Sequence, residues 1–137
     1  MLIREYQESD LAQLRAIHAA QGFDYALPDL NNPLFVTKKI LANDGRTVGA
    51  TLLRLTAEAY LLLDPREGTP RQRWQWLLAL HDATESDAWL RGLEDVHAWL
   101  PPPIARKFGK RLARLRWIRD DAWTPYCRKL NMPRPKD

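Results

Sequence analysis

The chain has 137 residues, a length that suits one domain able to bury its own hydrophobic core. Hydrophobic residues make up 45% of it, but no apolar run approaches the roughly 18 to 20 residues that a membrane-spanning helix needs. The first residues lack the basic and then apolar pattern of a secretory signal, and Cys127 is the single cysteine, which excludes an internal disulfide. We therefore expect a globular, cytoplasmic protein without membrane contacts.

The charge is distributed unevenly along the chain, whose net charge is +4. Residues 101–137 contain 11 Lys and Arg against 3 Asp and Glu, whereas the first 100 residues contain 10 against 14. A basic carboxyl-terminal third favours an anionic partner, such as nucleic acid, a phosphorylated cofactor or an acidic protein surface. Solubility alone is the competing interpretation, because Lys and Arg are common on solvated helix faces.

The amino-terminal part predicts a strand, a helix and a loop. Residues 2–6 favour a strand, and Ser9 is a suitable N-cap for a helix that ends near Gly22. The inward face of this helix has apolar residues at helical spacing: Leu11, Leu14 and Ile17. Residues 23–33 contain two prolines and several Asn and Asp, which predicts an ordered loop.

A hairpin and a third strand follow. The runs 34–41 and 47–55 have strand character and flank Asp44 and Gly45. The Asp-Gly pair is typical of a tight hairpin turn, because such a turn needs positive φ angles. A further turn near Glu58 would add the strand 59–64 and make a meander.

A long helix begins after the Pro/Gly loop 64–69. Thr69 can act as N-cap, Pro70 suits the first helical position, and Gln72 completes a capping box. Gly92 predicts the end of the helix. The apolar stripe of this helix consists of Trp74, Leu77, Leu78, His81 and Ala88.

A strand is expected over 93–100, after that helix. The order strand, loop, helix, strand is a βαβ unit, which places the loop 64–69 at the carboxyl end of a strand. Open α/β sheets bind ligands at this position, so we expect any small-molecule site there.

The last third predicts a second amphipathic helix after the prolines at 101–103. Its apolar residues are Ile104, Phe108, Leu112 and Leu115, and its basic residues are Arg106, Lys107, Lys110, Arg111 and Arg114. Residues 117–119 and 122–130 predict an antiparallel pair of strands. The polar tail 131–137 is expected to be loose.

This order of elements resembles the GNAT family of N-acetyltransferases over residues 2–130. The matching features are Ile3-Arg4, Glu8-Ser9-Asp10-Leu11, the hairpin Asp44 to Ala50, the strand end Leu63-Asp64-Pro65, and the helix before Trp117. The resemblance implies an α/β (α+β) fold in a single domain, residues 1–130. Its sheet would be mixed, mostly antiparallel and six to seven strands wide, with flanking helices.

The resemblance also implies an acetyl-CoA or other acyl-CoA cofactor, whose pyrophosphate lies where the long helix begins. A helix start suits phosphate because its N–H groups are unpaired and its dipole end is positive. The family's signature is Arg or Gln, two residues, Gly, one residue, then Gly or Ala. The present segment keeps Gly68 and has Pro70 where an amide would be available. The implied cofactor-binding residues are Leu63, Asp64, Pro65, Arg66, Gly68, Thr69, Arg71 and Arg73.

These departures predict an anion held by the guanidinium groups of Arg66, Arg71 and Arg73 more than by backbone amides. The alternative is that Gly68 and Thr69 only turn the chain and cap the helix.

Acyl transfer to an amine needs a base for the ammonium proton and an acid for the leaving thiolate. The tyrosine that many family members use as the acid falls here on Leu112. The candidate catalytic residues in its place are Glu58, Tyr60 and His97, and Tyr126 is a further candidate. Each could instead be a structural residue of a turn or strand. The three histidines and one cysteine show no metal-ligand spacing.

Two functions follow from the sequence. The first, implied by the resemblance, is acyl-CoA-dependent transfer to a small-molecule or peptide amine by direct attack. The family also implies an acceptor pocket lined by the last hairpin and by loop 23–33, which carries Asp24, Tyr25 and Asp29. The second is a GNAT-fold binding module without activity, whose basic helix Arg106 to Arg114 contacts nucleic acid or an acidic protein. Either could act as a monomer or a homodimer.

Overall fold

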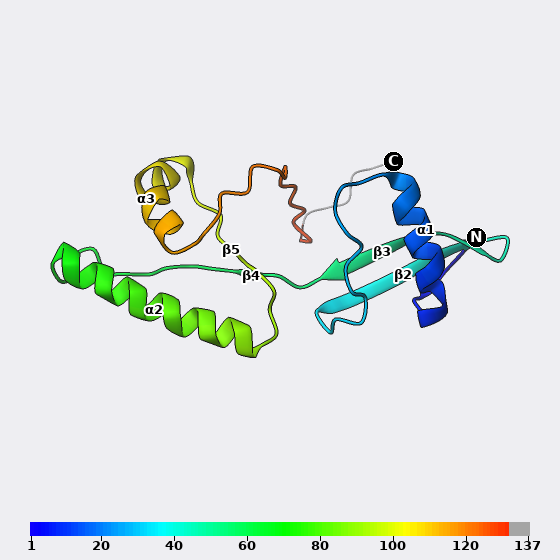
Figure 1. Cartoon of the computed structure of the whole chain (residues 1–137), viewed down its shortest axis with the longest axis horizontal. Helices are drawn as coiled ribbons and strands as arrows, with labels where there is room; N and C mark the ends of the chain where they lie inside the picture. The colour runs from blue at the N-terminus through cyan, green and yellow to red at the C-terminus, as the bar shows by residue number, and fades with distance from the viewer. Residues whose placement is uncertain (132–137) are drawn as a thin grey trace. The chain divides into compact units, whose positions relative to one another are not determined.

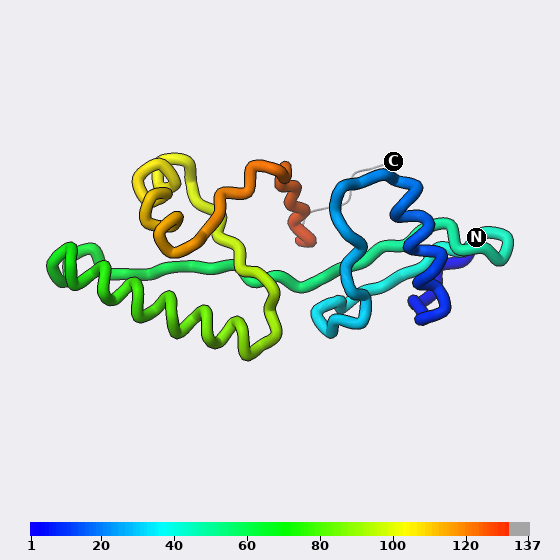
Figure 2. The backbone as a smooth tube through the Cα atoms, viewed as in Figure 1, coloured from blue at the N-terminus to red at the C-terminus, as the bar shows by residue number. Residues whose placement is uncertain are grey.

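The computed structural model describes residues 1–131 (Figures 1 and 2). The predicted tail 131–137, apart from its first residue, lies outside the described residues. The elements are β1 (Leu2–Glu5), the short 3-10 helix η1 (Glu8–Asp10), α1 (Leu11–Gln21), β2 (Phe35–Asn43), β3 (Arg46–Arg54), β4 (Ala57–Glu58), α2 (Pro70–Leu90), β5 (Val96–His97) and α3 (Pro102–Arg114). The chain forms two compact units, residues 1–98 and the part that begins at Trp99.

Strands β1, β2 and β3 form an antiparallel sheet in that order, with Ile3 opposite Leu41 and Ile40 opposite Ala50. Asp44 (φ 50°) and Gly45 (φ 75°) both have positive φ angles, so the predicted hairpin turn is confirmed. Helix α1 packs on this sheet (Figure 1), and the buried core consists of Leu14, Leu30 and Ile40.

The start of α1 differs from the prediction, because Ser9 is not its N-cap. Residues Glu8–Asp10 form a 3-10 turn, and Asp10 is the N-cap of α1. The buried Asp10 carboxylate accepts two hydrogen bonds from the Arg4 guanidinium, at 2.8 and 2.9 Å, and one from the Gln7 N–H at 2.8 Å. These bonds fix the chain before α1, which places the cap one residue later. Gly22, at φ 74°, ends the helix as predicted.

A second, smaller sheet pairs β4 with β5 in parallel, and α2 connects the two strands. The predicted βαβ order is therefore confirmed. The capping box of α2 is also confirmed: the Gln72 N–H donates to Thr69 Oγ1 (3.2 Å) and the Thr69 N–H donates to Gln72 Oε1 (2.9 Å). Gly92 (φ 77°) follows the end of α2 as expected.

The fold is thus mixed α and β, with three α-helices, but the predicted six- to seven-stranded sheet is not seen among residues 1–131. The expected strand 59–64 is wrong, because β4 is Ala57–Glu58, where a turn was predicted, and none of residues 59–64 is in a strand. The expected strand 93–100 pairs only at Val96 and His97, and no strand is present in 117–130. Prolines at 65 and at 101–103 cannot donate ladder hydrogen bonds. Asp120, Asp121 and Pro125 are likewise residues that strands disfavour.

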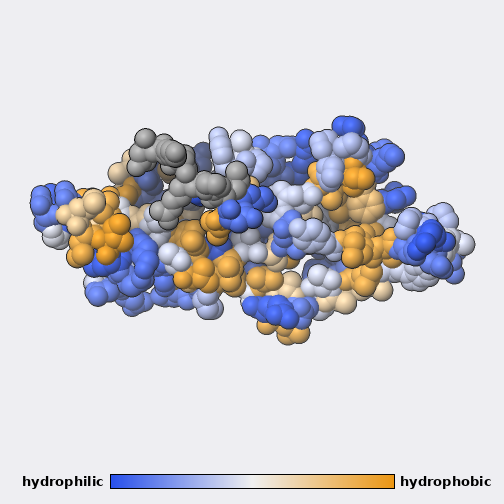
Figure 3. Space-filling view, turned by 180° about the vertical axis from the view of Figure 1, so that it is seen from behind, coloured by the Kyte–Doolittle hydropathy of each residue, from blue (hydrophilic) through white to orange (hydrophobic). Residues whose placement is uncertain are grey.

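The second unit contains α3, which confirms the predicted amphipathic helix. Arg116, at φ 66°, turns the chain after α3, and the Trp117 N–H donates to the Leu112 carbonyl at 3.0 Å. No residue of α3 is buried. Hydrophobic areas are interspersed with hydrophilic ones on the face seen in Figure 3, in keeping with many exposed large apolar side chains, Ile118 and Trp123 among them.

Candidate functional site

The parallel pair of β4 and β5 brings the three predicted catalytic residues together. Glu58 and His97 are register partners, so their side chains leave neighbouring strands at the same level. Tyr60, two residues after Glu58, lies on the same face because side chains alternate along extended chain. Its hydroxyl donates a hydrogen bond of 2.7 Å to Glu58 Oε1. The grouping that the sequence could only suggest is therefore a local feature of one strand pair.

The electrostatics of this group favour the protonated form of Tyr60. The hydrogen bond to the Glu58 carboxylate and the charge of that carboxylate raise the pKa of Tyr60, so the phenol keeps its proton. Tyr60 is 81% exposed and Glu58 is exposed as well, which leaves both groups accessible to a substrate. The pair therefore offers a carboxylate that can accept a proton beside a phenol that can donate one.

A chain of polar contacts leads away from His97. Asp95 Oδ1 lies 3.4 Å from His97 Nε2, and Asp95 Oδ2 lies 3.6 Å from Arg54 Nη2. Arg54 Nη1 donates to Glu94 Oε2 at 2.9 Å, and Asn32 Nδ2 donates to Glu94 Oε1 at 2.9 Å. Apart from His97, none of these residues was predicted individually from the sequence to belong to a site. The only signal was the acidic pair Glu94-Asp95 near the start of the predicted strand 93–100.

Through the hydrogen bond of Asn32 to Glu94, these contacts link loop 23–33 to the residues just before β5. Two of the other residues predicted to line an acceptor pocket, Tyr25 and Asp29, have local partners. Tyr25 stacks on Phe23 with ring centroids 5.6 Å apart, and Asp29 Oδ1 accepts the Asn31 N–H at 3.0 Å. Tyr126 belongs to the second unit and lies in its irregular, exposed segment. The predicted last hairpin, which would have carried Tyr126, is absent from 117–130.

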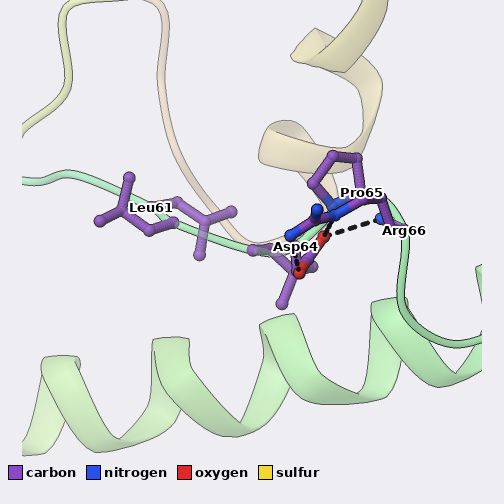
Figure 4. Close-up of a pocket in the computed structure, with 6 residues that line it drawn as sticks. Leu61, Asp64, Pro65 and Arg66 are labelled. Atoms are coloured by element: carbon purple, nitrogen blue, oxygen red, sulfur yellow. Dashed lines mark hydrogen bonds and ion pairs between the residues drawn. The ribbon is translucent and has the colours of Figure 1, made fainter.

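A pocket of about 600 Å³ lies after β4, at residues 61–66, and overlaps the loop 64–69 at which the sequence predicts a ligand site. Six consecutive residues line it, and the predicted cofactor residues Leu63, Asp64, Pro65 and Arg66 are among them (Figure 4). The Arg66 guanidinium donates to both carboxylate oxygens of Asp64 at 3.0 Å, and these bonds hold the pKa of Asp64 below its ordinary value. The pocket is open and follows one extended stretch of the chain, with three leucines, of which Leu62 is 90% exposed, and a charged end.

The start of α2, next to this pocket, does not fit a phosphate cradled by backbone amides. The amides of Thr69 and Gln72 are used within the cap, and Pro70 has no N–H. Gly68 has a φ of 73°, and the Trp76 ring lies so close that an added Cβ would be 2.5 Å from it. The predicted turn at Gly68 and the predicted cap at Thr69 are therefore confirmed.

Of the three arginines in this segment, Arg66 and Arg73 already have partners in the chain, and Arg71 is available to an anion. Arg66 and Arg71 are exposed, and Arg73 donates to the Pro65 carbonyl at 2.7 Å. Within residues 1–131 Arg71 makes no hydrogen bond or ion pair. Guanidinium groups bind phosphate through paired N–H donors and need no free backbone amide.

One group on α2 has side chains that could reach a metal ion, and the sequence analysis did not single it out. The ligand atoms of His81, Asp82 and Glu85 lie within 4.8 Å of one another. His81 Nδ1 is 3.9 Å from the Asp82 carboxylate and 3.8 Å from that of Glu85. Both carboxylates are exposed, and such groups are common without an ion, so we assign no metal to this group.

Comparisons with known proteins give no family for this chain. It matches no family model, no curated protein and no solved structure. In the part of the chain that is described, no helix combines the length and the apolar character needed to cross a membrane. The function must therefore be inferred from the site itself.

Proposed function

We propose that this protein is an N-acyltransferase that moves an acyl group from an acyl-CoA, such as acetyl-CoA, to an amine of a small molecule or peptide. One observation carries the proposal: the β4-β5 pair groups Glu58, Tyr60 and His97, and the pocket at residues 61–66 begins directly after Tyr60. The GNAT-like order of elements supports the same class. The reaction would take place in the cytoplasm, where the exposed, unpaired Cys127 stays reduced.

Glu58 and Tyr60 have distinct roles in the proposed transfer. When bound, an acyl-CoA supplies an activated thioester carbonyl. Glu58 accepts the proton that the attacking ammonium must lose. Tyr60 gives its Oη proton to the departing sulfur and recovers the second proton that the nitrogen loses as the amide forms. The C–N bond forms as the C–S bond breaks, so no covalent enzyme intermediate is needed. Most of the rate would come from holding the amine and the carbonyl in contact.

The phosphates of the cofactor would be held by Arg66, Arg71 and Arg73, and its pantetheine arm would lie along the three leucines of the pocket. A side-chain site of this kind binds more weakly than a preformed amide cradle, because exposed guanidinium groups lose conformational freedom on binding. Arg66 must also exchange its Asp64 partner for phosphate.

Calorimetric titration with acetyl-CoA and with CoA, at low and moderate salt, tests the proposal. We expect saturable binding of one ligand per chain, weakened about tenfold or more in the Arg66→Ala/Arg71→Ala variant because two charge-assisted contacts are lost. The Arg119→Ala/Arg128→Ala variant is the control, since it removes two exposed cations that are not among the pocket residues 61–66 or the arginines near them. Absence of heat and of a thermal shift at millimolar cofactor would refute the proposal.

A further inference from the structure

Helix α3 has a continuous cationic face that the proposed acyl transfer does not use. Its basic residues follow the spacing i, i+1, i+4, i+5 and i+8, and they are Arg106, Lys107, Lys110, Arg111 and Arg114. At 100° per residue this spacing places all five within an arc of about 140°, along about 12 Å of the helix. All five are exposed. The apolar residues Ile104, Phe108, Leu112 and Leu115 occupy the other side.

Within residues 1–131 the cationic face has no acidic partner. Several other cations of this part of the chain do have a carboxylate close by, as Arg4 has Asp10 and Arg91 has Asp87. In contrast, no ion pair involves the five α3 cations within this part of the chain. The sequence from Pro102 to Arg119 contains seven Lys and Arg and no Asp or Glu. The face is therefore a concentrated positive field without local neutralisation.

We propose that this face of α3 binds the phosphodiester backbone of a nucleic acid. A duplex carries one negative charge for about every 1.7 Å of its axis. A stretch of about 12 Å therefore has enough phosphates to pair with all five cations. Carboxylates on a folded acidic protein are rarely so dense, which favours nucleic acid over a protein partner. Three of the five cations are arginines, whose planar donors suit phosphate oxygens. Backbone contacts of this kind carry no sequence preference.

Fluorescence anisotropy with labelled DNA and RNA of about 20 nucleotides, single-stranded and duplex, tests this interface in the full chain. Affinity should fall with salt at a log-log slope of about −3 to −4, as expected for four or five neutralised phosphates. Preference for RNA or for DNA would identify the source of the phosphates, and either result supports the proposal. Labelled polyglutamate that binds as tightly at equal charge would overturn it in favour of an acidic protein.

Two triple variants separate the face from net charge. Arg106→Ala/Lys110→Ala/Arg114→Ala should weaken binding at least tenfold at low salt, because three phosphate contacts are lost. Arg15→Ala/Arg46→Ala/Lys129→Ala removes the same charge from exposed positions outside α3 and should change affinity less than about twofold. Equal losses in both variants would overturn the proposal. Arg106→Lys/Arg111→Lys/Arg114→Lys keeps the charge and should retain binding, which excludes misfolding as the cause of a loss.

Discussion

The three-stranded sheet and the β4-β5 pair use similar polar contacts in opposite surroundings. In the first, the Arg4 guanidinium and the Asp10 carboxylate form a two-bond pair, and Asp10 is buried beside a core in which Ile40 has 0% exposure. In the second, the Tyr60 hydroxyl donates a hydrogen bond to the Glu58 carboxylate, and Tyr60 is exposed to solvent. The buried pair contributes to stability, whereas the exposed pair contributes little to it and stays available for chemistry.

The largest effect should come from the buried core of the first region. Ile40→Ala removes a fully buried side chain and should lower the free energy of unfolding by about 2 to 5 kcal/mol. Leu62→Ala, next to the second region, truncates a side chain that is 90% exposed and should change it by less than about 0.5 kcal/mol. Urea denaturation followed by circular dichroism measures both. Equal losses would show that the β4 segment is packed as firmly as the sheet.

Substitutions in the exposed pair, Tyr60 and Glu58, should instead lower kcat. Tyr60→Phe keeps the ring and removes the hydroxyl, so kcat should fall about 100-fold under the proposed function while the free energy of unfolding stays nearly unchanged. Glu58→Gln should have a similar effect because its amide cannot accept the proton. Steady-state assays with an accepted amine, beside thermal melts, give the two readouts. An unchanged kcat in both variants would remove these residues from the mechanism.

The buried pair should make stability depend on acid. The Arg4 hydrogen bonds lower the pKa of Asp10 from 3.8 to about 2. The ionised carboxylate therefore stabilises the fold fully above its ordinary pKa, by about 2 kcal/mol, and this stabilisation is lost as the pH falls through 2. Asp10→Asn should remove that part of the pH dependence. Urea midpoints measured between about pH 5 and pH 2 in both proteins provide the comparison. Parallel curves would contradict the assigned role.

The smallest effect should distinguish the two helix starts. Thr69→Ala removes the hydroxyl that accepts the Gln72 N–H and should cost about 1 kcal/mol. Ser9→Ala should cost less than about 0.5 kcal/mol, because Asp10 and not Ser9 is the N-cap of α1. Thermal melts of the two variants are sufficient. A larger loss for Ser9→Ala would mean that its hydroxyl supports the 3-10 turn.

Local signals made part of this fold predictable. Asp44-Gly45 and the series Thr69, Pro70, Gln72 specify their turn and cap through neighbours within three residues, and both were confirmed. The order of elements was enough to predict the parallel β4-β5 pair. The length of these strands was not predictable, because an apolar run such as 59–64 extends a ladder only where a partner strand is present.

The contacts around His97 show why the rest of the site escaped prediction. Asn32 and Glu94 are 62 positions apart, and Arg54 and Glu94 are 40 apart. Single charged residues of this kind are common on any surface, so nothing in the sequence pairs them. Glu58, Tyr60 and His97 could be nominated from their strands, but only the register shows that Glu58 lies beside His97.

Residues other than glycine are disfavoured at position 68 for two independent reasons. Its φ of 73° disfavours every residue with a Cβ, and that Cβ would lie 2.5 Å from a ring carbon of Trp76. A saturation library would therefore leave glycine almost alone at this position, while Trp76→Ala would remove the clash and restore some tolerance. Mutational tolerance at residue 68 would then report on where the indole ring lies, without any ligand or activity.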